Sequence, residues 1–159
     1  MIMLVSQHND IMVDDALALH SFGSKLNVAI VGATGGLGRA FVEALIPFPT
    51  VLNIFCLSRS NIQIDNNKTA WYHLDLEDED SIIAAAASIQ QSVGDLHLVI
   101  VATGMLHDGD RLQPEKSWRD IDGSAIESVF RLNTIGPALV AKHFLPLLVK
   151  NQKSVFAAL

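Results

Sequence analysis

The sequence predicts an α/β fold built around a doubly wound parallel sheet, and two observations lead to this prediction. Short, almost continuously apolar runs, typical of strands buried on both faces, alternate along the chain with longer segments of helical periodicity. The first of these runs, residues 28–31, leads into a turn with four glycines between 32 and 38 and then into an amphipathic segment. Strand, glycine turn and helix in this order place a helix N-terminus against a phosphate. Alternating strands and helices imply right-handed crossovers and hence one parallel sheet.

The composition is that of a single globular domain. Of 159 residues, 50% are hydrophobic and 18% are charged, which excludes a disordered chain. The net charge of −6 argues against nucleic acid and acidic membrane surfaces as partners, because both bind clustered Lys and Arg. Cys56 is the only cysteine, which excludes a disulfide scaffold and favours a reduced compartment. No apolar stretch reaches the roughly 18 residues of a transmembrane helix and no signal peptide is recognised, so we expect a cytoplasmic protein.

The chain divides into an N-terminal extension, residues 1–26, and a nucleotide-binding domain, residues 27–159. Asn9 or Asp10 is placed to cap a short helix that ends near Gly23. Nothing in the extension carries chemistry. Two interpretations of it stay open: it is loosely packed, or it docks on the domain or on a partner.

Within the domain, the first helix is predicted over 39–46 and is closed by Pro47 and Pro49. A second apolar strand follows at 51–57, and after a polar loop a third strand covers 69–74. The acidic residues 77–80 then fill the first turn of the next helix, where the helix dipole favours negative charge.

That helix continues through 82–93, and the fourth strand is predicted over 96–101. A looser segment, 105–120, contains a helical turn after Pro114. A long helix then covers about 123–150. Residues 154–159 begin a fifth strand, so we expect the sheet to be incomplete at its C-terminal end.

The glycine turn has a separate role for each position. Gly32 allows the tight turn off the strand, Gly35 or Gly36 lets the backbone approach a pyrophosphate, and Gly38 lets helix and strand pack closely. A side chain at the middle position would fill the space that the phosphate needs. A glycine triplet alone is weak evidence, and its place between a strand and a helix makes the prediction much stronger.

The residues after the second strand indicate which cofactor binds. An acidic residue about 20 positions past the glycines binds a ribose 2′-hydroxyl, whereas an arginine accommodates a 2′-phosphate. That place holds Ser58 and Arg59 and no carboxylate. Ser58 can hydrogen-bond a phosphate and Arg59 can pair with it bidentately, which favours NADP(H) over NAD(H). The alternative is that Arg59 is an ordinary solvated loop residue.

Taken together, these motifs resemble the short-chain dehydrogenase/reductase superfamily over about residues 27–159. Gly32-x-x-x-Gly36-x-Gly38 has the spacing of its cofactor loop. The resemblance implies a Rossmann-like fold and an NADP(H)-dependent transfer of hydride between nicotinamide and a carbonyl or alcohol. The residues it implies for the cofactor, with the adenine pair 75–76 and the turn 103–104, are Gly32, Thr34, Gly35, Gly36, Leu37, Gly38, Ser58, Arg59, Asp75, Leu76, Thr103 and Gly104.

Asn133 is similar to the family's active-site asparagine, which helps to hold a water beside the catalytic lysine. It lies on an otherwise apolar helical stripe that includes Phe130 and Pro137. Because Pro137 has no N–H, the Asn133 carbonyl loses its helical partner and the helix is expected to kink there. The alternative is a satisfied buried asparagine beside a harmless kink.

Two departures from the family pattern concern the cofactor-binding part. Val101 and Ala102 stand where the family has two asparagines in the turn after the fourth strand. The glycines also fit Gly32-x-x-Gly35-x-x-Gly38, the spacing of the extended and atypical branches, which include non-catalytic redox sensors. The segment around Asn133 favours the ordinary reductase branch.

The catalytic tyrosine, lysine and serine of the family are missing. The only tyrosine, Tyr72, is followed four positions later by Leu76, so no Tyr-x-x-x-Lys occurs. The six histidines show no spacing of a metal site. We therefore expect the cofactor-binding front of a truncated reductase that does not turn over, or alternatively a non-catalytic dinucleotide-binding or interaction module. An exposed fifth strand would favour homo-oligomers or pairing through the sheet edge.

Overall fold

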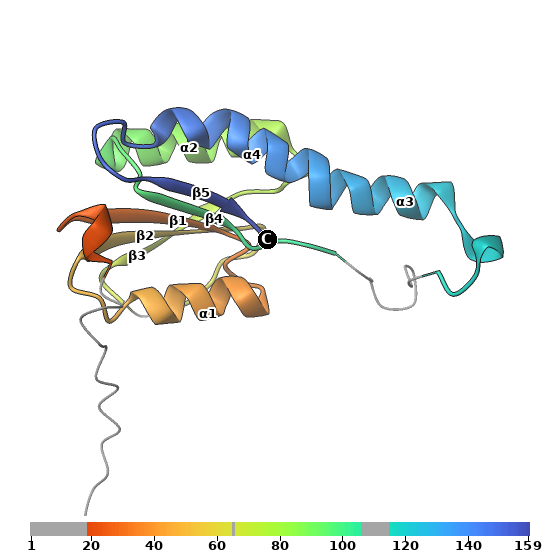
Figure 1. Ribbon diagram of the computed structural model, residues 1–159, viewed down its shortest axis with the longest axis horizontal. Coiled ribbons are helices and arrows are strands. Elements are labelled where there is room, and N and C mark those ends of the chain that lie inside the picture. The colour runs from red at the N-terminus through yellow and green to blue at the C-terminus, as the bar shows by residue number, and fades with distance from the viewer. Residues whose placement is uncertain (1–18, 65, 106–114) are drawn as a thin grey trace, which may run out of the picture.

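The computed structural model describes residues 19–64, 66–105 and 115–159, and its centre is a five-stranded parallel sheet (Figure 1). The strand order is β3-β2-β1-β4-β5, and every neighbouring pair is parallel. The predicted doubly wound sheet is confirmed. The strands are β1 Leu26–Val31, β2 Val51–Ser58, β3 Thr69–His73, β4 Leu98–Val101 and β5 Val155–Ala158.

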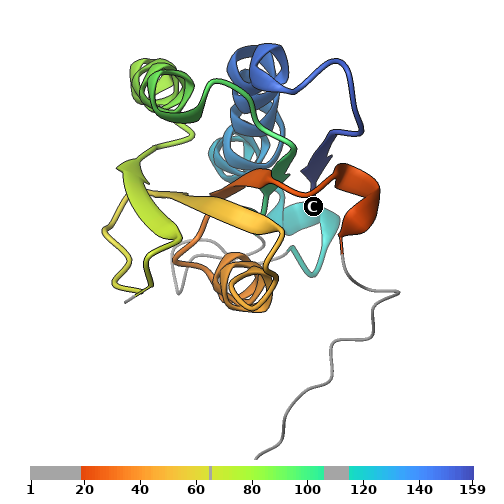
Figure 2. The same cartoon turned by 90° about the vertical axis from the view of Figure 1, so that its left-hand side faces the viewer.

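Helices cover both faces of the sheet (Figures 1 and 2). Helix α1, Gly36–Leu45, lies on one face, and α2, Glu79–Val93, and α4, Gly136–Phe144, lie side by side on the other. Side chains of β1 alternate between the two faces: Val28 packs in the cluster under α1, and Ala29 in the cluster under α2 and α4. Burial on both faces is the reason why β1 from Val28 on, and β2 from Ile54 on, are almost continuously apolar.

Helix α1 begins at Gly36, three residues earlier than predicted, with Gly35 as its N-cap. It ends at Leu45, before Pro47, as expected. Helix α2 begins one residue after Asp78, whose carboxylate caps the helix by accepting from the Asp80 N–H.

A charged contact joins α2 and α4, the two helices that share one face of the sheet. Glu79 Oε1 on α2 accepts a hydrogen bond from Lys142 Nζ at 2.8 Å, and His143 Nε2 lies 2.7 Å from the same oxygen. These partners hold the pKa of the Glu79 carboxyl below its usual range. Because the Lys142 side chain is exposed and the Glu79 side chain is only partly buried, the contact aligns α2 and α4 more than it adds stability.

The long helix predicted over 123–150 is interrupted, which corrects that prediction. Helix α3, Gly123–Phe130, continues into a π-helical turn, Arg131–Ile135, and then into α4, which ends in a short 3₁₀ turn, Leu145–Leu147. The irregularity lies just before Pro137, as predicted, because the missing N–H removes an α-helical hydrogen bond.

The fourth strand also starts later than predicted. Leu96 does not join the ladder of β1 but forms an isolated bridge with Leu148, which follows the last helical turn. The regular pairing of β4 with β1 begins at Leu98. The third strand likewise ends at His73, one residue early.

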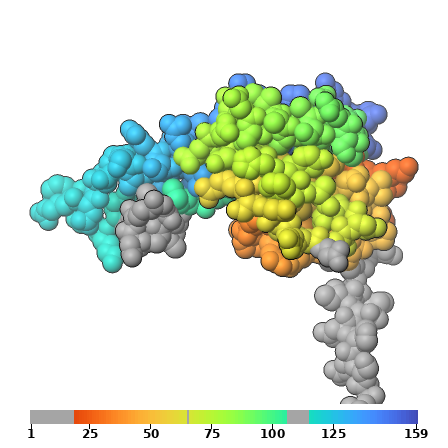
Figure 3. All heavy atoms as spheres, turned by 180° about the vertical axis from the view of Figure 1, so that it is seen from behind, coloured from red at the N-terminus to blue at the C-terminus, as the bar shows by residue number. Residues whose placement is uncertain are grey.

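Two helical segments lie outside the layers formed by the sheet and its covering helices. Residues 20–22 form a 3₁₀ turn in which Phe22 is buried in the cluster under α1, while the remainder of the predicted N-terminal helix lies outside the described residues. At the other end, α3 extends away from the sheet (Figures 1 and 3), and its large apolar side chains are exposed, with Phe130 at 55%. None of the helices in the described ranges is long and apolar enough to cross a bilayer.

Candidate functional site

The order in which the chain adds strands to the sheet reverses between the neighbouring strands β1 and β4. The chain runs from β1 outward to β2 and β3, then returns across the sheet to β4 on the other side of β1. At such a switch point, the loops that leave the carboxyl ends of the two strands diverge and open a crevice. Residues 32–38 leave β1 here and residues 102–105 leave β4.

A cavity of about 260 Å³ occupies this crevice. The loops after β1, β2, β3 and β4 all contribute to its wall. Nine of the residues that the sequence predicts for a cofactor line it, and Gly36, Leu37, Gly38 and Asn133 do not. Its lining residues are Val31, Gly32, Thr34, Gly35, Ser58, Arg59, Ser60, Leu74, Asp75, Leu76, Ala102, Thr103, Gly104 and Leu132.

Backbone conformation at the turn after β1 accounts for two of the glycines. Gly32 has φ +85°, in the left-handed region, and a Cβ there would lie 2.5 Å from Thr103 Cγ2. A Cβ at Gly38 would lie 2.7 Å from the Gly32 carbonyl carbon and 3.1 Å from Ala33 Cα. The first turn of α1 therefore packs directly on the backbone that leaves β1, as the sequence predicted.

The middle of the glycine turn is open. A Cβ at Gly35 would meet the Gly32 carbonyl oxygen at 3.3 Å, whereas a Cβ at Gly36 would meet nothing within 4 Å among the described residues. Gly36 is the first residue of α1, so its exposed backbone borders the positive end of the helix dipole. Both middle glycines are exposed: Gly35 lines the cavity, and Gly36, just beside it, is the position with room for a Cβ.

The loop after β2 holds a buried serine next to an exposed arginine. Ser58 is 4% exposed, and its hydroxyl donates to the Ser60 carbonyl at 2.7 Å while accepting from Trp71 Nε1 at 3.2 Å. A hydroxyl has a single proton, so Ser58 has none left for a ligand. Arg59 and Ser60 are exposed at the rim. Ser60 was missed by the sequence interpretation, and its position directly after Arg59 was the available signal.

Residues 75–76, which the sequence predicts to hold an adenine, are fixed by contacts at the start of helix α2. The Asp75 N–H donates to Ser81 Oγ at 2.9 Å, and Asp75 Oδ1 accepts from the Glu77 N–H at 3.1 Å. Leu76 is buried against Gly136 of α4, where a Cβ would lie 2.7 Å from Leu76 Cβ. The wall of the cavity at this point is thus built by close helix packing that no local motif indicates.

The turn after β4 carries an unsatisfied hydroxyl. Thr103 Oγ1 is buried and has no hydrogen-bond partner in the part of the chain that the structure describes. Buried polar atoms are nearly always paired, so a free one in a cavity wall points to a ligand or water. The Thr103 methyl carbon, Cγ2, lies against Gly32, so this threonine packs on the glycine turn.

Asn133 holds Met105, at the end of the same loop. Its amide nitrogen donates to the Met105 carbonyl at 2.9 Å, and its amide oxygen accepts from the Met105 N–H at 2.8 Å. Both polar atoms of the side chain are therefore used on backbone 28 residues away, so Asn133 positions the end of the 102–105 loop. Asn133 lies in the π-helical turn and is exposed, although the apolar stripe around it predicted a buried face.

Two other reactive side chains lie away from the cavity. The Tyr72 ring packs against Phe55 at 5.8 Å between centroids, in an edge-to-face arrangement. Burial raises the pKa of the Cys56 thiol to about 11, so this thiol is neutral and poorly reactive near pH 7.

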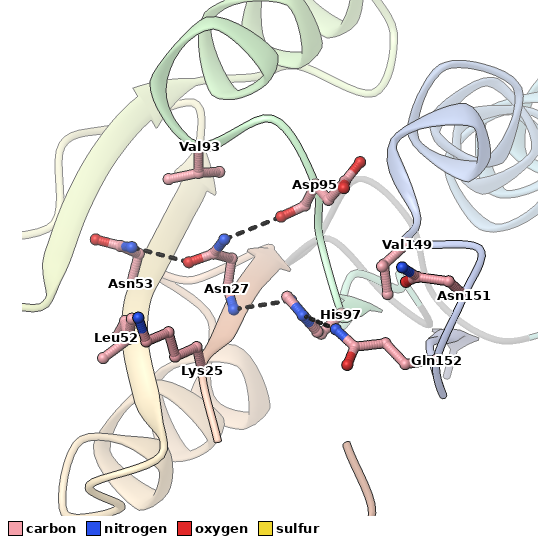
Figure 4. Close-up of a pocket in the computed structure, with 10 residues that line it drawn as sticks. All are labelled: Lys25, Asn27, Leu52, Asn53, Val93, Asp95, His97, Val149, Asn151 and Gln152. Atoms are coloured by element: carbon pink, nitrogen blue, oxygen red, sulfur yellow. Dashed lines mark hydrogen bonds between the residues drawn. The ribbon is translucent and has the colours of Figure 1, made fainter. Parts of the chain in front are cut away.

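A second hollow lies at the amino ends of β1, β2 and β4, at the opposite end of the strands from the cavity, and was not predicted (Figure 4). Four side chains there bind one another or the backbone. Asn53 Nδ2 donates to Asn27 Oδ1 at 2.8 Å, and Asn27 Nδ2 donates to the Asp95 carbonyl at 3.0 Å. His97 is 6% exposed; its Nδ1 accepts from the Asn27 N–H at 3.2 Å, and its Nε2 lies 2.7 Å from the Gln152 amide. This network ties β1, β2 and the segment before β5 together.

Comparison with known proteins gives concordant results. Mouse (Mus musculus) estradiol 17-beta-dehydrogenase 11 is 24% identical over 131 residues, which are 78% of this chain and 42% of that protein. The NADPH-bound carbonyl reductase from chicken fatty liver superposes with a TM-score of 0.66 at 24% identity, over 77% of this chain and 52% of its own. An NADH-dependent reductase, A1-R′, in complex with NAD superposes with a TM-score of 0.70 at 15% identity, over 86% and 60%.

The chain thus spans between 42% and 60% of the length of these proteins. The model of the short chain dehydrogenase family matches residues 26–156, from the first residue of β1 into β5. Together with the parallel sheet and the cavity at its switch point, this match over most of the sequence establishes that the chain belongs to the short chain dehydrogenase family.

Proposed function

We propose that this chain is the NADP(H)-binding part of a short-chain oxidoreductase, with residues 27–159 as the binding domain. The observation that carries the proposal is the cavity at the switch point, which is bordered by the open backbone of the glycine turn on one side and Arg59 on the other. When bound, the cofactor supplies a hydride that passes between nicotinamide and a carbonyl or alcohol carbon.

The residues present fit the diphosphate of such a cofactor. Gly36 leaves open backbone at the start of α1, where the N–H groups and helix dipole favour an anion. Thr34 and Gly35 line the cavity next to it, and Leu37 is exposed on the first turn of α1. The unsatisfied Thr103 hydroxyl, on the loop after β4, offers a further hydrogen bond. Gly32 and Gly38 act by shaping the turn.

The adenosine end is assigned to the loops after β2 and β3. Asp75 and Leu76 would hold the adenine, and Arg59 would pair with a 2′-phosphate. Because the Ser58 hydroxyl is already engaged, Ser58 contributes by shaping the loop. The NADPH in the similar chicken carbonyl reductase and the NAD in the similar reductase A1-R′ are both compatible with the fold, so the preference depends on these side chains.

The arrangement around Asn133 suits binding more than chemistry. Its amide holds the Met105 backbone, and so fixes the loop that carries Thr103 and Gly104 beside the cavity. With no Tyr-x-x-x-Lys in the sequence and Tyr72 packed on Phe55, we expect nucleotide binding without turnover from these 159 residues.

The proposal is tested by titrating the purified chain with NADPH and NADH, alongside the variant Arg59→Glu. The native chain should bind NADPH at least tenfold more tightly than NADH, because a charge-assisted hydrogen bond is worth roughly 1.5–3 kcal/mol. Arg59→Glu should abolish or reverse this preference, since a carboxylate repels the 2′-phosphate and can bind ribose hydroxyls. No binding of either nucleotide at millimolar concentration would contradict the proposal.

A second candidate function, an association module, is supported by the edge of the sheet. β5 pairs only with β4 among the described strands, and the N–H groups of Val155 and Leu159 point toward β4. Those of the alternate residues, including Ala158, therefore point outward and can pair with a second copy. Exposed apolar side chains on and before α3 add to this, with Trp118 at 74%.

If the edge pairs, sedimentation of the native chain should show a dimer, and Ala158→Pro should shift it to the monomer. Proline removes the outward N–H and leaves the bonds to β4 in place. Ala157→Ser, on the same strand, is the control and should leave the dimer unchanged. A native chain that sediments as a monomer at tens of micromolar would exclude this function.

A further inference from the structure

The loop that carries Arg59 is held by two side chains of the edge strand β3. Trp71 and His73 are two residues apart and pair in register with Cys56 and Ser58, so they point to the same face as Ser58. The Trp71 indole N–H donates to the Ser58 hydroxyl, which in turn donates to the Ser60 carbonyl. His73 Nδ1 lies 3.2 Å from the Arg59 carbonyl oxygen.

The donors and acceptors in these contacts are fully matched. A carbonyl oxygen only accepts, so His73 Nδ1 carries a proton and donates it to Arg59. An indole N–H only donates, so the Ser58 hydroxyl accepts from Trp71 and directs its own proton to Ser60. Three successive loop residues, 58, 59 and 60, are thereby each bound to a side chain. We call the set Trp71, His73 and Ser58 the loop brace.

The loop brace leaves the Arg59 side chain exposed on a fixed backbone. With the carbonyls of Arg59 and Ser60 held, the position of the Arg59 Cα is set before any ligand arrives. A guanidinium on a fixed backbone gives up less conformational entropy when it pairs with a phosphate. Trp71 lies on the edge strand and is 36% exposed, so it is not a core residue. The hydrogen bond to Ser58 is therefore the better explanation for a tryptophan at this position.

We infer that Trp71 and His73 are positioning residues that set the preference for a 2′-phosphorylated nucleotide by holding loop 58–60. The inference rests on the proposed function, because both residues act through Arg59. It adds two determinants on β3, outside the residues that line the cavity.

The first test compares the ratio of NADPH to NADH affinity between variants. In the double variant Trp71→Phe/His73→Leu, the new side chains are of similar bulk but cannot donate the two hydrogen bonds to the loop. The variant should lower the ratio of NADPH to NADH affinity about fivefold, the order expected when neutral hydrogen bonds are lost, with little change in the affinity for NADH. In an Arg59→Gln background the same double change should lower the ratio no further, because the effect passes through Arg59. His73→Asn is the matched control, since its amide nitrogen can replace Nδ1 as donor, and it should keep the native ratio.

The second test needs no nucleotide. Trypsin cleaves after arginine, and a loop released from β3 opens more often to the protease. Cleavage between Arg59 and Ser60 should be about fivefold faster in Trp71→Phe/His73→Leu than in the native chain, in line with loss of the same hydrogen bonds. His73→Asn should be cleaved at the native rate. Cleavage that is not faster in the double variant overturns the inference.

The two proposals fail in different ways. If Arg59→Gln lowers the affinity ratio and Trp71→Phe/His73→Leu does not, the loop brace is not a selectivity determinant, while NADP(H) binding stands. If the native chain binds neither nucleotide, or if Arg59→Gln leaves the ratio unchanged, the proposed preference fails and the assignment of Trp71 and His73 falls with it.

Discussion

Gly38→Ala is expected to lower the free energy of unfolding by about 3 kcal/mol or more, at the upper end of what overpacking costs. The added methyl group would lie 2.7 Å from the Gly32 carbonyl carbon and 3.1 Å from Ala33 Cα. Both are backbone atoms of the turn that leaves β1, so neither can swing away as a side chain would. Relief requires α1 to move off the central strand, which would disturb the packing of Val42 in the cluster beneath it.

The measurement is urea unfolding of both chains, followed by circular dichroism. Gly36→Ala is the matched control, because a Cβ there meets nothing within 4 Å in the described part of the chain and alanine is roughly 0.5–1 kcal/mol better than glycine inside a helix. The control should therefore be as stable as the native chain or slightly more so. A Gly38→Ala chain within about 0.5 kcal/mol of native, the range of an ordinary surface change, would disprove the close contact between α1 and β1.

The second large effect is a loss of stability in mild acid that depends on His97. Burial lowers the pKa of the His97 imidazole below its ordinary value of 6.5, and the nearby Asp95 carboxylate opposes this only in part. The unfolded chain therefore binds the proton at a higher pH than the folded chain does. The stability that neutral His97 provides is fully present above pH 6.5 and is lost as the pH falls from there through the folded pKa.

Geometry gives the reason for this loss. Nδ1 of His97 accepts a hydrogen bond from the Asn27 N–H, at the point where β1 and the chain before β4 run side by side. A proton on Nδ1 would place two donors face to face, and the contact would break. Figure 4 shows that Asp95 and Lys25 line the same hollow as His97.

The variants His97→Asn and His97→Leu separate titration from packing. Asparagine can present an acceptor near the position of Nδ1 and does not titrate, so this chain should lose the stability change between pH 7 and 5. His97→Leu leaves the Asn27 N–H without its acceptor and should cost about 1–3 kcal/mol at pH 7.5. Thermal unfolding over this pH range provides the measurement, with the exposed His20→Asn as control. An identical pH profile for native and His97→Asn chains would refute the role of His97.

The parts of the fold that were predicted correctly depend on short stretches of sequence. Residues 28–31 and 54–57 are continuously apolar because each run is buried on both faces of the sheet, and that property is visible in the residues themselves. Gly32 and Gly38 were predicted from their spacing, since the turn they allow involves only neighbouring backbone. Pro137 disturbs the helix through its own missing N–H.

Predictions that depended on distant partners were less complete. The long helix was expected to continue to 150, but Leu148 leaves it to pair with Leu96, more than fifty residues earlier. Ser58 carries a hydroxyl that could bind a phosphate, yet this hydroxyl already forms hydrogen bonds with Trp71 and Ser60. Asn133 was interpreted from its motif, and its amide is bound to Met105.

The sequence by itself determined the succession of strands and helices along the chain, the glycine turn and the family. Apolar periodicity and glycine spacing are local properties of the chain, so they are visible without the fold. Only the tertiary structure decided which polar atoms remain available for a ligand. A polar atom forms its hydrogen bond with whichever partner the fold brings within reach, as Trp71 is brought to Ser58 and Gln152 to His97. Those partners are 13 and 55 residues apart in the chain, so no local pattern could have indicated them.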